Sequence, residues 1–417
     1  MLSGCNRNKS MNRLNLTQEW DKTFPQSELV DHRKVTFDNL FGITLAADLY
    51  VPKNADGKLP AIAVCGPFGA VKEQSSGLYA QHMAERGFVT LAFDPSFTGE
   101  SGGEPRRMAS PDINTEDFSA AVDYLSNHEM VDAERIGIIG ICGWGGIALN
   151  TAAVDPRIKA TVASTMYELT RVNEKGYFDQ NDSEDARYAM RRMVARQRTE
   201  DFRTGEHPRA GGVVDPERIG IIGICGWGGI ALNAAAVDPR IKATVASTMY
   251  ELTRVNEKGY FDQNDSEDAR YAMRQMVARQ RTEDFRTSEH PRAGGVVDPL
   301  PDDAPWFVKE YHAYYKCPRG YHPRSGNSTD GWAIDGMMPM LNTRLLHYAG
   351  EIRSAVLIVH GEKAHSRYMG EDAFKLLRGD NKELMIIPGA THVDLYDDVK
   401  GVIPYDKFES FFNTYLK

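Results

Sequence analysis

The 417-residue sequence has little cysteine, no long apolar run and no excess of positive charge. Its five cysteines include no CxxC pair, so neither a disulfide framework nor a zinc site is indicated. No apolar run approaches the roughly 18 residues that a membrane-spanning helix needs. The formal net charge of −9 has the wrong sign for neutralising a phosphate backbone, so nucleic acid is not an expected partner.

These absences favour a cytoplasmic protein with no membrane span, and so few cysteines fit a reducing compartment. The first residues, MLSGC, match a lipoprotein cleavage box but lack the charged and apolar regions that should precede one. If translation starts upstream of Met1, the alternative is a periplasmic lipoprotein.

A long internal repeat dominates the sequence. Residues 131–213 return as residues 214–296, and two blocks this long are unlike the short stacking units of a solenoid. We interpret the repeat as a tandem duplication within a chain that was shorter by one copy. The copies differ at four positions, namely Ala133/Pro216, Thr151/Ala234, Arg192/Gln275 and Gly205/Ser288.

Short apolar runs alternate with helical patterns along much of the chain. Residues 34–51 predict a hairpin of two strands, and mostly apolar runs such as 135–141 and 354–361 predict buried strands. Such strands, separated by helices, indicate a parallel sheet covered on both faces. The predicted fold class is therefore α/β, with a mostly parallel, doubly wound sheet, helices on both faces and an inserted lid.

The same patterns divide the chain into segments. We predict an N-terminal extension over residues 1–30, followed by the first part of the sheet domain over 31–165. The polar and aromatic stretch 166–345 is expected to hold a lid and the duplicated block 214–296. Residues 346–417 are expected to complete the sheet.

The segment RIGIIGICGWGGIALN has the form of a strand, a sharp turn and a helix, at residues 135–150 and again at 218–233. In this form a nucleophile occupies the strained apex of a glycine-rich turn. The apex residue is Cys142 in copy one and Cys225 in copy two, and the start of the following helix stabilises a thiolate. A frame shifted by two residues would place Trp144 at the apex and leave no nucleophile.

The repeated turn, together with DPSFTGESGG at 94–103 and HGEKAHSR at 360–367, resembles α/β-hydrolases of the dienelactone-hydrolase-like group. Within that group the sequence is most similar to the uncharacterised bacterial YcjY type. The resemblance implies a hydrolase of carboxylic esters or lactones that acts on a small-molecule substrate. It implies Cys142 or Cys225 as the nucleophile and no metal or organic cofactor.

The resemblance also implies the partners of the nucleophile. His392, after the last predicted strand, matches the catalytic base of the family, and a neutral imidazole can take a thiol proton. The family's acid is not found at its usual spacing. Glu362 is the nearest carboxylate, while Glu168 and Asp394 are alternatives.

Two backbone N–H groups are expected to form an oxyanion hole. One belongs to the residue after the nucleophile, Gly143 or Gly226. The other is expected in the turn after the third strand, where Phe68 or Gly69 can donate and Pro67, lacking an N–H, cannot.

One sheet has room for one copy of the turn. Because short connections are favoured, we expect copy one to enter the sheet and Cys142, rather than Cys225, to meet His392. The surplus block then carries an apolar strand without a natural partner. Such a strand favours aggregation, a homodimer or a domain-swapped oligomer.

Two further functions stay open at this point. One is a non-catalytic α/β-hydrolase-fold protein that binds a small acyl ligand or a protein, with Trp144 filling the cleft. The other is a peptidase, because the fold alone does not exclude amide substrates. A dinucleotide-binding loop is disfavoured, since the sequence lacks the G-x-G-x-x-G pattern.

Overall fold

The computed structural model describes residues 14–53, 55–166, 168–180, 182–204, 219–397 and 399–416. By its internal contacts the chain divides into two compact units. Unit 1 consists of Met1–Thr170 and Ala278–Ser288, and unit 2 consists of Arg171–Val277 and Glu289–Lys417.

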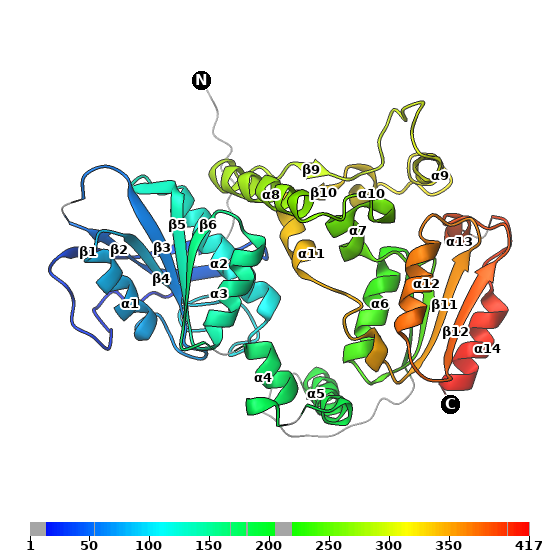
Figure 1. The fold of residues 1–417 in the computed structure, drawn as a ribbon, viewed down its shortest axis with the longest axis horizontal. Coiled ribbons are helices and arrows are strands. Elements are labelled where there is room, and N and C mark those ends of the chain that lie inside the picture. Colours follow the sequence, from blue (N-terminus) through cyan, green and yellow to red (C-terminus); the bar gives the residue numbers. More distant parts are fainter. Residues whose placement is uncertain are drawn as a thin grey trace. The chain divides into compact units, whose positions relative to one another are not determined.

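Unit 1 is built on a six-stranded sheet with the order β1-β2-β4-β3-β5-β6 (Figure 1). The first two strands form the predicted hairpin, β2 pairs antiparallel with β4, and the remaining pairs are parallel. The strands are β1 (Val30–Asp38), β2 (Thr44–Pro52), β3 (Leu59–Cys65), β4 (Val89–Phe93), β5 (Val131–Ile141) and β6 (Ile158–Ser164). The helices are α1 (Ser75–Ala84), α2 (Pro111–Ser126) and α3 (Gly143–Val154).

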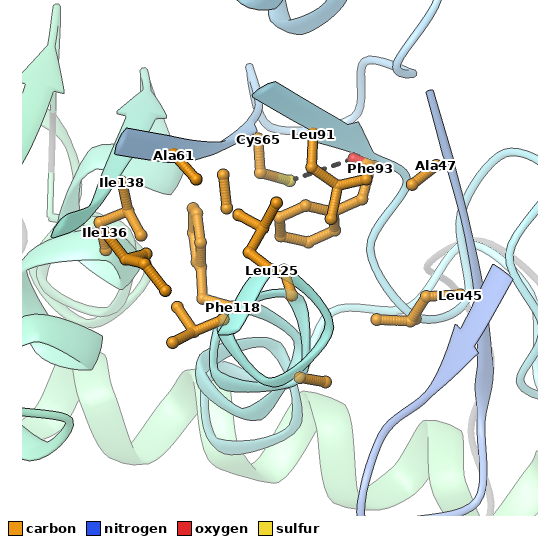
Figure 2. Packing of buried hydrophobic residues seen from close by; sticks show 14 of the residues in the cluster. Leu45, Ala47, Ala61, Cys65, Leu91, Phe93, Phe118, Leu125, Ile136 and Ile138 are labelled. Carbon is orange, nitrogen blue, oxygen red and sulfur yellow. Dashed lines mark hydrogen bonds between the residues drawn. The ribbon is translucent and has the colours of Figure 1, made fainter. Parts of the chain in front are cut away.

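Both faces of the unit 1 sheet are covered, which is why its inner strands are apolar throughout. On one face Phe93 packs with Phe118 of α2 and Trp144 of α3. Figure 2 shows part of this cluster, including the hydrogen bond of 3.6 Å from Cys65 Sγ to the Phe93 carbonyl. Alternate strand residues such as Ile139 point to the other face, where they pack against α1.

Unit 2 contains a four-stranded parallel sheet with the order β12-β11-β8-β7. Two strands come from copy two of the repeat and two from the C-terminal segment. Helices α6 and α12 cover one face and α14 covers the other (Figure 1). These elements are β7 (Ile219–Ile224), α6 (Gly226–Val237), β8 (Ile241–Ser247), β11 (Ala355–Gly361), α12 (Arg367–Leu376), β12 (Lys382–Ile387) and α14 (Tyr405–Tyr415).

The remaining elements are mostly short helices, and α8 is the longest of those from copy two. Its last residues belong to unit 1. No helix in the described ranges is both long and apolar enough to cross a membrane. These elements are α4 (Leu169–Lys175), α5 (Glu184–Thr204), α7 (Leu252–Lys258), α8 (Glu267–Thr287), α9 (Trp306–Tyr315), α10 (Gly326–Thr329), α11 (Met338–Asn342), α13 (Asp394–Asp397) and the strand pair β9 (Arg292–Ala293) and β10 (Trp332–Ala333).

The structure differs from the expected single sheet with one surplus copy. In unit 1, β5 of copy one pairs with β3, and in unit 2, β8 of copy two pairs with β11. The stretch 166–345 therefore contributes two sheet strands as well as several helices, and the apolar strand of copy two, β7, has β8 as its neighbour. The physical reason is that each copy offers two strands: the first strand of copy one, β5, is the neighbour of β3, and the second strand of copy two, β8, is the neighbour of β11, so each copy completes a separate sheet.

Identical residues of the two copies consequently have different surroundings. Trp144 follows the inner strand β5 and is 4% exposed, whereas Trp227 follows the edge strand β7 and is 69% exposed. The contrast reverses at the next strand of each copy. Val162, on the edge strand β6, is 51% exposed, and Val245, on the inner strand β8, is 0% exposed.

This contrast predicts very different costs for one substitution made at two matched sites. Trp144→Ala removes a buried indole and should destabilise unit 1 by about 3–5 kcal/mol. Trp227→Ala removes a largely exposed indole and should change stability by no more than about 0.5 kcal/mol. Urea denaturation of the full chain, followed by circular dichroism, measures both. Equal costs would contradict the placement of β5 inside a sheet and β7 at an edge.

Candidate active site

Both copies place a cysteine at the apex of the strand–helix turn. The backbone φ is 62° at Cys142 and 57° at Cys225, in a region that residues other than glycine rarely adopt. The alternative frame does not fit, because Trp144 lies inside α3. Each cysteine N–H donates to a carbonyl at the end of the next strand, Ser164 at 2.8 Å and Ser247 at 3.1 Å.

The glycine two residues before each cysteine is required by the close approach of the following helix. A Cβ on Gly140 would clash with the backbone carbonyl of Trp144, and one on Gly223 would clash with that of Trp227. The turn is therefore the same tight structure in both copies. Any chemical difference between them comes from their surroundings.

In unit 1 the turn of copy one adjoins the predicted oxyanion turn after β3. A Cβ on Gly66 would clash with the carbonyl of Ile141, so only glycine allows this approach. The same turn carries the exposed Phe68 and Gly69, whose φ is 84°. The structure thus brings the predicted donor turn next to the elbow of copy one.

In unit 2 the turn of copy two shares a strand end with the histidine loop. The carbonyl of His392 accepts a hydrogen bond of 3.3 Å from Thr248 Oγ1, and Thr248 directly follows β8. The residue before it, Ser247, is the one that accepts from the N–H of Cys225. The histidine predicted to meet Cys142 therefore belongs to the unit that contains Cys225, because β8 and not β6 is the neighbour of β11.

Both ring nitrogens of His392 are hydrogen-bonded. Nδ1 lies 2.8 Å from Ser366 Oγ, and Nε2 lies 2.9 Å from the hydroxyl oxygen of Tyr396. The ring is fully buried. Burial, reinforced by the nearby His365 and His360, lowers the pKa of His392 well below its ordinary value. The imidazole is therefore neutral near pH 7.

The predicted acid residues each hold a turn or a helix start. Glu362 accepts a hydrogen bond of 2.7 Å from a backbone N–H in the turn after β12. Asp394 accepts one of 2.9 Å from the N–H three residues before it, and Glu168 accepts one of 3.0 Å in the first turn of α4. At Nδ1 of His392 the structure supplies a hydroxyl rather than a carboxylate.

The thiol of Cys225 is half-buried among polar groups. Burial raises the pKa of this thiol, while hydrogen bonds from the Tyr396 hydroxyl, the Gly226 N–H and the Tyr311 hydroxyl favour the thiolate and oppose the rise. The predicted donor of copy two, Gly226, begins α6 in unit 2. Its counterpart Gly143 begins α3 in unit 1.

Two more histidines surround the His392 ring. The ring centroid of His365 lies 4.7 Å from that of His392, and burial lowers the pKa of His365 to about 4. Burial likewise lowers the pKa of His360 to about 3. Neither ring nitrogen of His360 has a hydrogen-bond partner within the described part of the chain. All three rings are therefore neutral near pH 7.

Sequence reasoning missed Ser366 and Tyr396. Ser366 lies in the segment after β11 where the family resemblance implies a carboxylate, and it has a hydroxyl instead. Tyr396 follows His392 by four residues, a spacing that places two side chains on one face of a helical turn. From that spacing the sequence could have predicted Tyr396 as a neighbour of His392.

Known proteins match the chain at several levels. The family profile of the X-Pro dipeptidyl-peptidase (S15 family) matches residues 42–210. Uncharacterized protein PA2218 of Pseudomonas aeruginosa is 46% identical over 406 residues, which is 97% of this chain and 86% of that protein. Its crystal structure aligns with 97% of this chain and 99% of its own at 44% identity and a TM-score of 0.43.

Two other relatives are more distant. Uncharacterized protein YcjY of Escherichia coli is 28% identical over 372 residues, which is 88% of this chain and 93% of that protein. A thiohydrolase of Eupenicillium brefeldianum is 32% identical over 139 residues, which is 33% of this chain and 44% of that protein.

The buried histidines predict that acid destabilises unit 2. A histidine with a folded pKa of about 3, as for His360, and an unfolded pKa of about 6.5 binds fewer protons when folded. The free energy of unfolding is therefore unaffected by this histidine above about pH 6.5. Between pH 6 and 4 it decreases by about 1.4 kcal/mol per pH unit, because only the unfolded chain takes up the proton. We expect His360→Leu to remove this contribution, so that its unfolding free energy falls less steeply with acid than that of the wild type.

Urea denaturation of both proteins at pH 8, 6, 5 and 4 measures the difference. At pH 8 the variant should be at least as stable as the wild type, because leucine leaves no buried polar group without a partner. Parallel pH profiles for the two proteins would contradict the neutral, buried state of His360.

Proposed function

The chain belongs to the α/β-hydrolase superfamily, in the family of PA2218, and from this premise we propose that it hydrolyses small carboxylic esters or lactones with Cys225 as nucleophile and His392 as base. One observation carries the proposal. In unit 2 a cysteine at a strained strand–helix apex and the loop of a buried, neutral histidine are both hydrogen-bonded to adjacent residues at the end of β8.

In the acylation step the sulfur of Cys225 attacks the acyl carbon and its proton passes to His392 Nε2. The hydrogen bond at Nδ1 prepares the ring for this role. With Nδ1–H donating to Ser366 Oγ, the lone pair of Nε2 is left to accept a proton. The imidazolium then gives its proton to the leaving alkoxide, and a thioester on Cys225 results.

In the second step water attacks the thioester, with His392 again as the base, and the carboxylic acid leaves. The developing oxyanion needs fixed donors close to the sulfur. In unit 2 we assign this role to the Gly226 N–H and the Tyr311 hydroxyl, because both lower the pKa of the Cys225 thiol and so favour negative charge beside it. In unit 1 the donors proposed for the turn of Cys142 remain Gly143 with Phe68 or Gly69, residues that the sequence alone suggests.

A hydroxyl at Nδ1 in place of a carboxylate suits a thiol nucleophile. A thiol ionises more readily than an alcohol, so the histidine needs less help from a third residue. The names of two partial relatives, a thiohydrolase and an acyltransferase, support acyl-transfer chemistry. The S15 family profile makes an amide substrate the alternative.

The duplication provides a matched control for the nucleophile. We expect Cys225→Ala to lose at least about 1,000-fold of the turnover of p-nitrophenyl acetate, because no thioester can form. His392→Ala should lose at least about 100-fold, the usual contribution of a general base. Cys142→Ala should retain full turnover, and so should Glu362→Gln, whose carboxylate holds a backbone turn.

Several outcomes would contradict the proposal. Turnover that survives in the double variant Cys142→Ala/Cys225→Ala rules out a cysteine mechanism. Loss of turnover in Cys142→Ala alone moves the active site to copy one. An absence of turnover on esters, with cleavage of an Xaa-Pro p-nitroanilide, points to a peptidase, and no turnover of either substrate favours a binding protein.

A further inference from the structure

The repeat leaves one unpaired sheet edge in each unit. Within the described part of the chain, β6 ends the sheet of unit 1 and β7 ends the sheet of unit 2, so each pairs on one side only. Both have an identical counterpart that is paired on both sides, because β8 repeats β6 and the second half of β5 repeats β7. These inner strands show what each unpaired edge accepts.

The neighbour accepted at both edges is an apolar, parallel strand. On the side where β6 is unpaired, its counterpart β8 pairs with β11, and on the side where β7 is unpaired, its counterpart β5 pairs with β3. Both pairings are parallel, and β11 is buried along its whole length. The two edges therefore have the sequence of strands from the middle of a parallel sheet, without the second neighbour that such strands require.

Apolar side chains beside both edges are exposed although their repeats are buried. The β6 patch is 39% to 51% exposed, its repeats at most 1%, and it consists of Leu149, Val162 and Met166, which repeat as Leu232, Val245 and Met249. The β7 patch is 44% to 69% exposed, its repeats at most 5%, and it consists of Ile222, Ile224 and Trp227, which repeat Ile139, Ile141 and Trp144. A missing neighbour accounts for both patches.

The two patches match each other on both faces of the sheet. Helices α3 and α6 follow identical strands and cover the same face of them, and Leu149 of α3 and Trp227 of α6 lie on that face. Val162 and Ile222 lie on the opposite face, because their repeats pack toward α14 and α1. If β6 and β7 pair in parallel, Leu149 is therefore on the same face as Trp227, and Val162 is on the same face as Ile222.

The other ends of the two sheets are protected by charge. The edge strand β1 contains Asp31, Arg33 and Lys34, and the edge strand β12 begins with Lys382 and Glu383. Charged side chains on an edge strand prevent its pairing with another molecule. By contrast, β7 contains no charged residue and β6 contains one lysine, at its second position. Among the described strands of more than two residues, β6 and β7 are thus the apolar edges, and each fits the other.

We propose that this protein self-associates by parallel pairing of β7 in one molecule with β6 in a second copy of the chain. The partner is a second copy because, within one molecule, the two strands end separate sheets. The two edges differ, so each molecule in a pair keeps one unpaired edge, and association continues beyond the dimer unless the ends close into a ring. The interface is independent of the proposed catalytic function.

Sedimentation velocity of the full chain, over about a 100-fold range of concentration, tests the proposal. We expect a species larger than the monomer that grows with concentration. Val162→Lys and Ile222→Lys each place a charge in one pairing edge, and each should weaken association by at least about 100-fold, because the interface would bury that charge without a partner. Both positions are about half exposed, so the circular dichroism spectrum of each variant should match that of the wild type.

A mixture of the two variants tests which edges meet. Val162→Lys keeps an intact β7 edge, and Ile222→Lys keeps an intact β6 edge. An equal mixture should therefore form a heterodimer and nothing larger, although each variant alone is monomeric at the same concentration. Recovery in the mixture also shows that both variants are folded. A mixture that stays monomeric, with both variants folded by circular dichroism, contradicts the pairing of β6 with β7.

Leu29→Lys in unit 1 and Leu376→Lys in unit 2 are the matched controls. They add the same charge at exposed leucines beside β1 and at the end of α12, and both should associate like the wild type. Equal loss of association in the controls would identify a general effect of charge and overturn the proposal. A monomeric wild type at every concentration overturns it as well. Loss in Val162→Lys alone indicates pairing of β6 with β6, loss in Ile222→Lys alone indicates pairing of β7 with β7, and either result contradicts the proposed interface.

Discussion

A parallel strand inside a sheet needs a neighbour along each edge, and this requirement decides where each copy of the repeat lies. In unit 1, β3 pairs with β5, and in unit 2, β11 pairs with β8. One sequence thus serves as the inner part of two sheets, and β6 and β7 are left as edge strands. The different burial of Trp144 and Trp227, and of Val162 and Val245, follows from this pairing, because the residues within each pair are identical.

The pairing also separates the residues that the family resemblance implies as one active site, because some of them lie in unit 1 and others in unit 2. The elbow of Cys142 has the glycine turn after β3 beside it, while the unit of Cys225 contains the histidine loop after β12. A hydrolytic nucleophile depends first on a base that can take its proton. For that reason the neutral, buried His392, with its bonds to Ser366 and Tyr396, makes copy two the better candidate.

The sequence alone predicts a large part of this account. Apolar periodicity predicts the strands and the hairpin, and the glycine spacing predicts the elbow with cysteine at its apex. The expectation that copy one would meet His392 rested on short connections, whereas the structure places His392 in the unit of copy two. Two nearly identical segments contain no information about their neighbours. The choice of Glu362 followed from its closeness along the chain, whereas its side chain turns to a backbone N–H and leaves Nδ1 of His392 to a serine hydroxyl.

The most direct test of the central claim is to find which cysteine becomes acylated. The protein is mixed with p-nitrophenyl acetate and quenched in acid, and the tryptic peptides of residues 136–157 and 219–240 are weighed; they differ in mass because Thr151 stands opposite Ala234. The account predicts an acetyl group on Cys225, absent when His392 is replaced by alanine. Acetylation confined to Cys142 would contradict it.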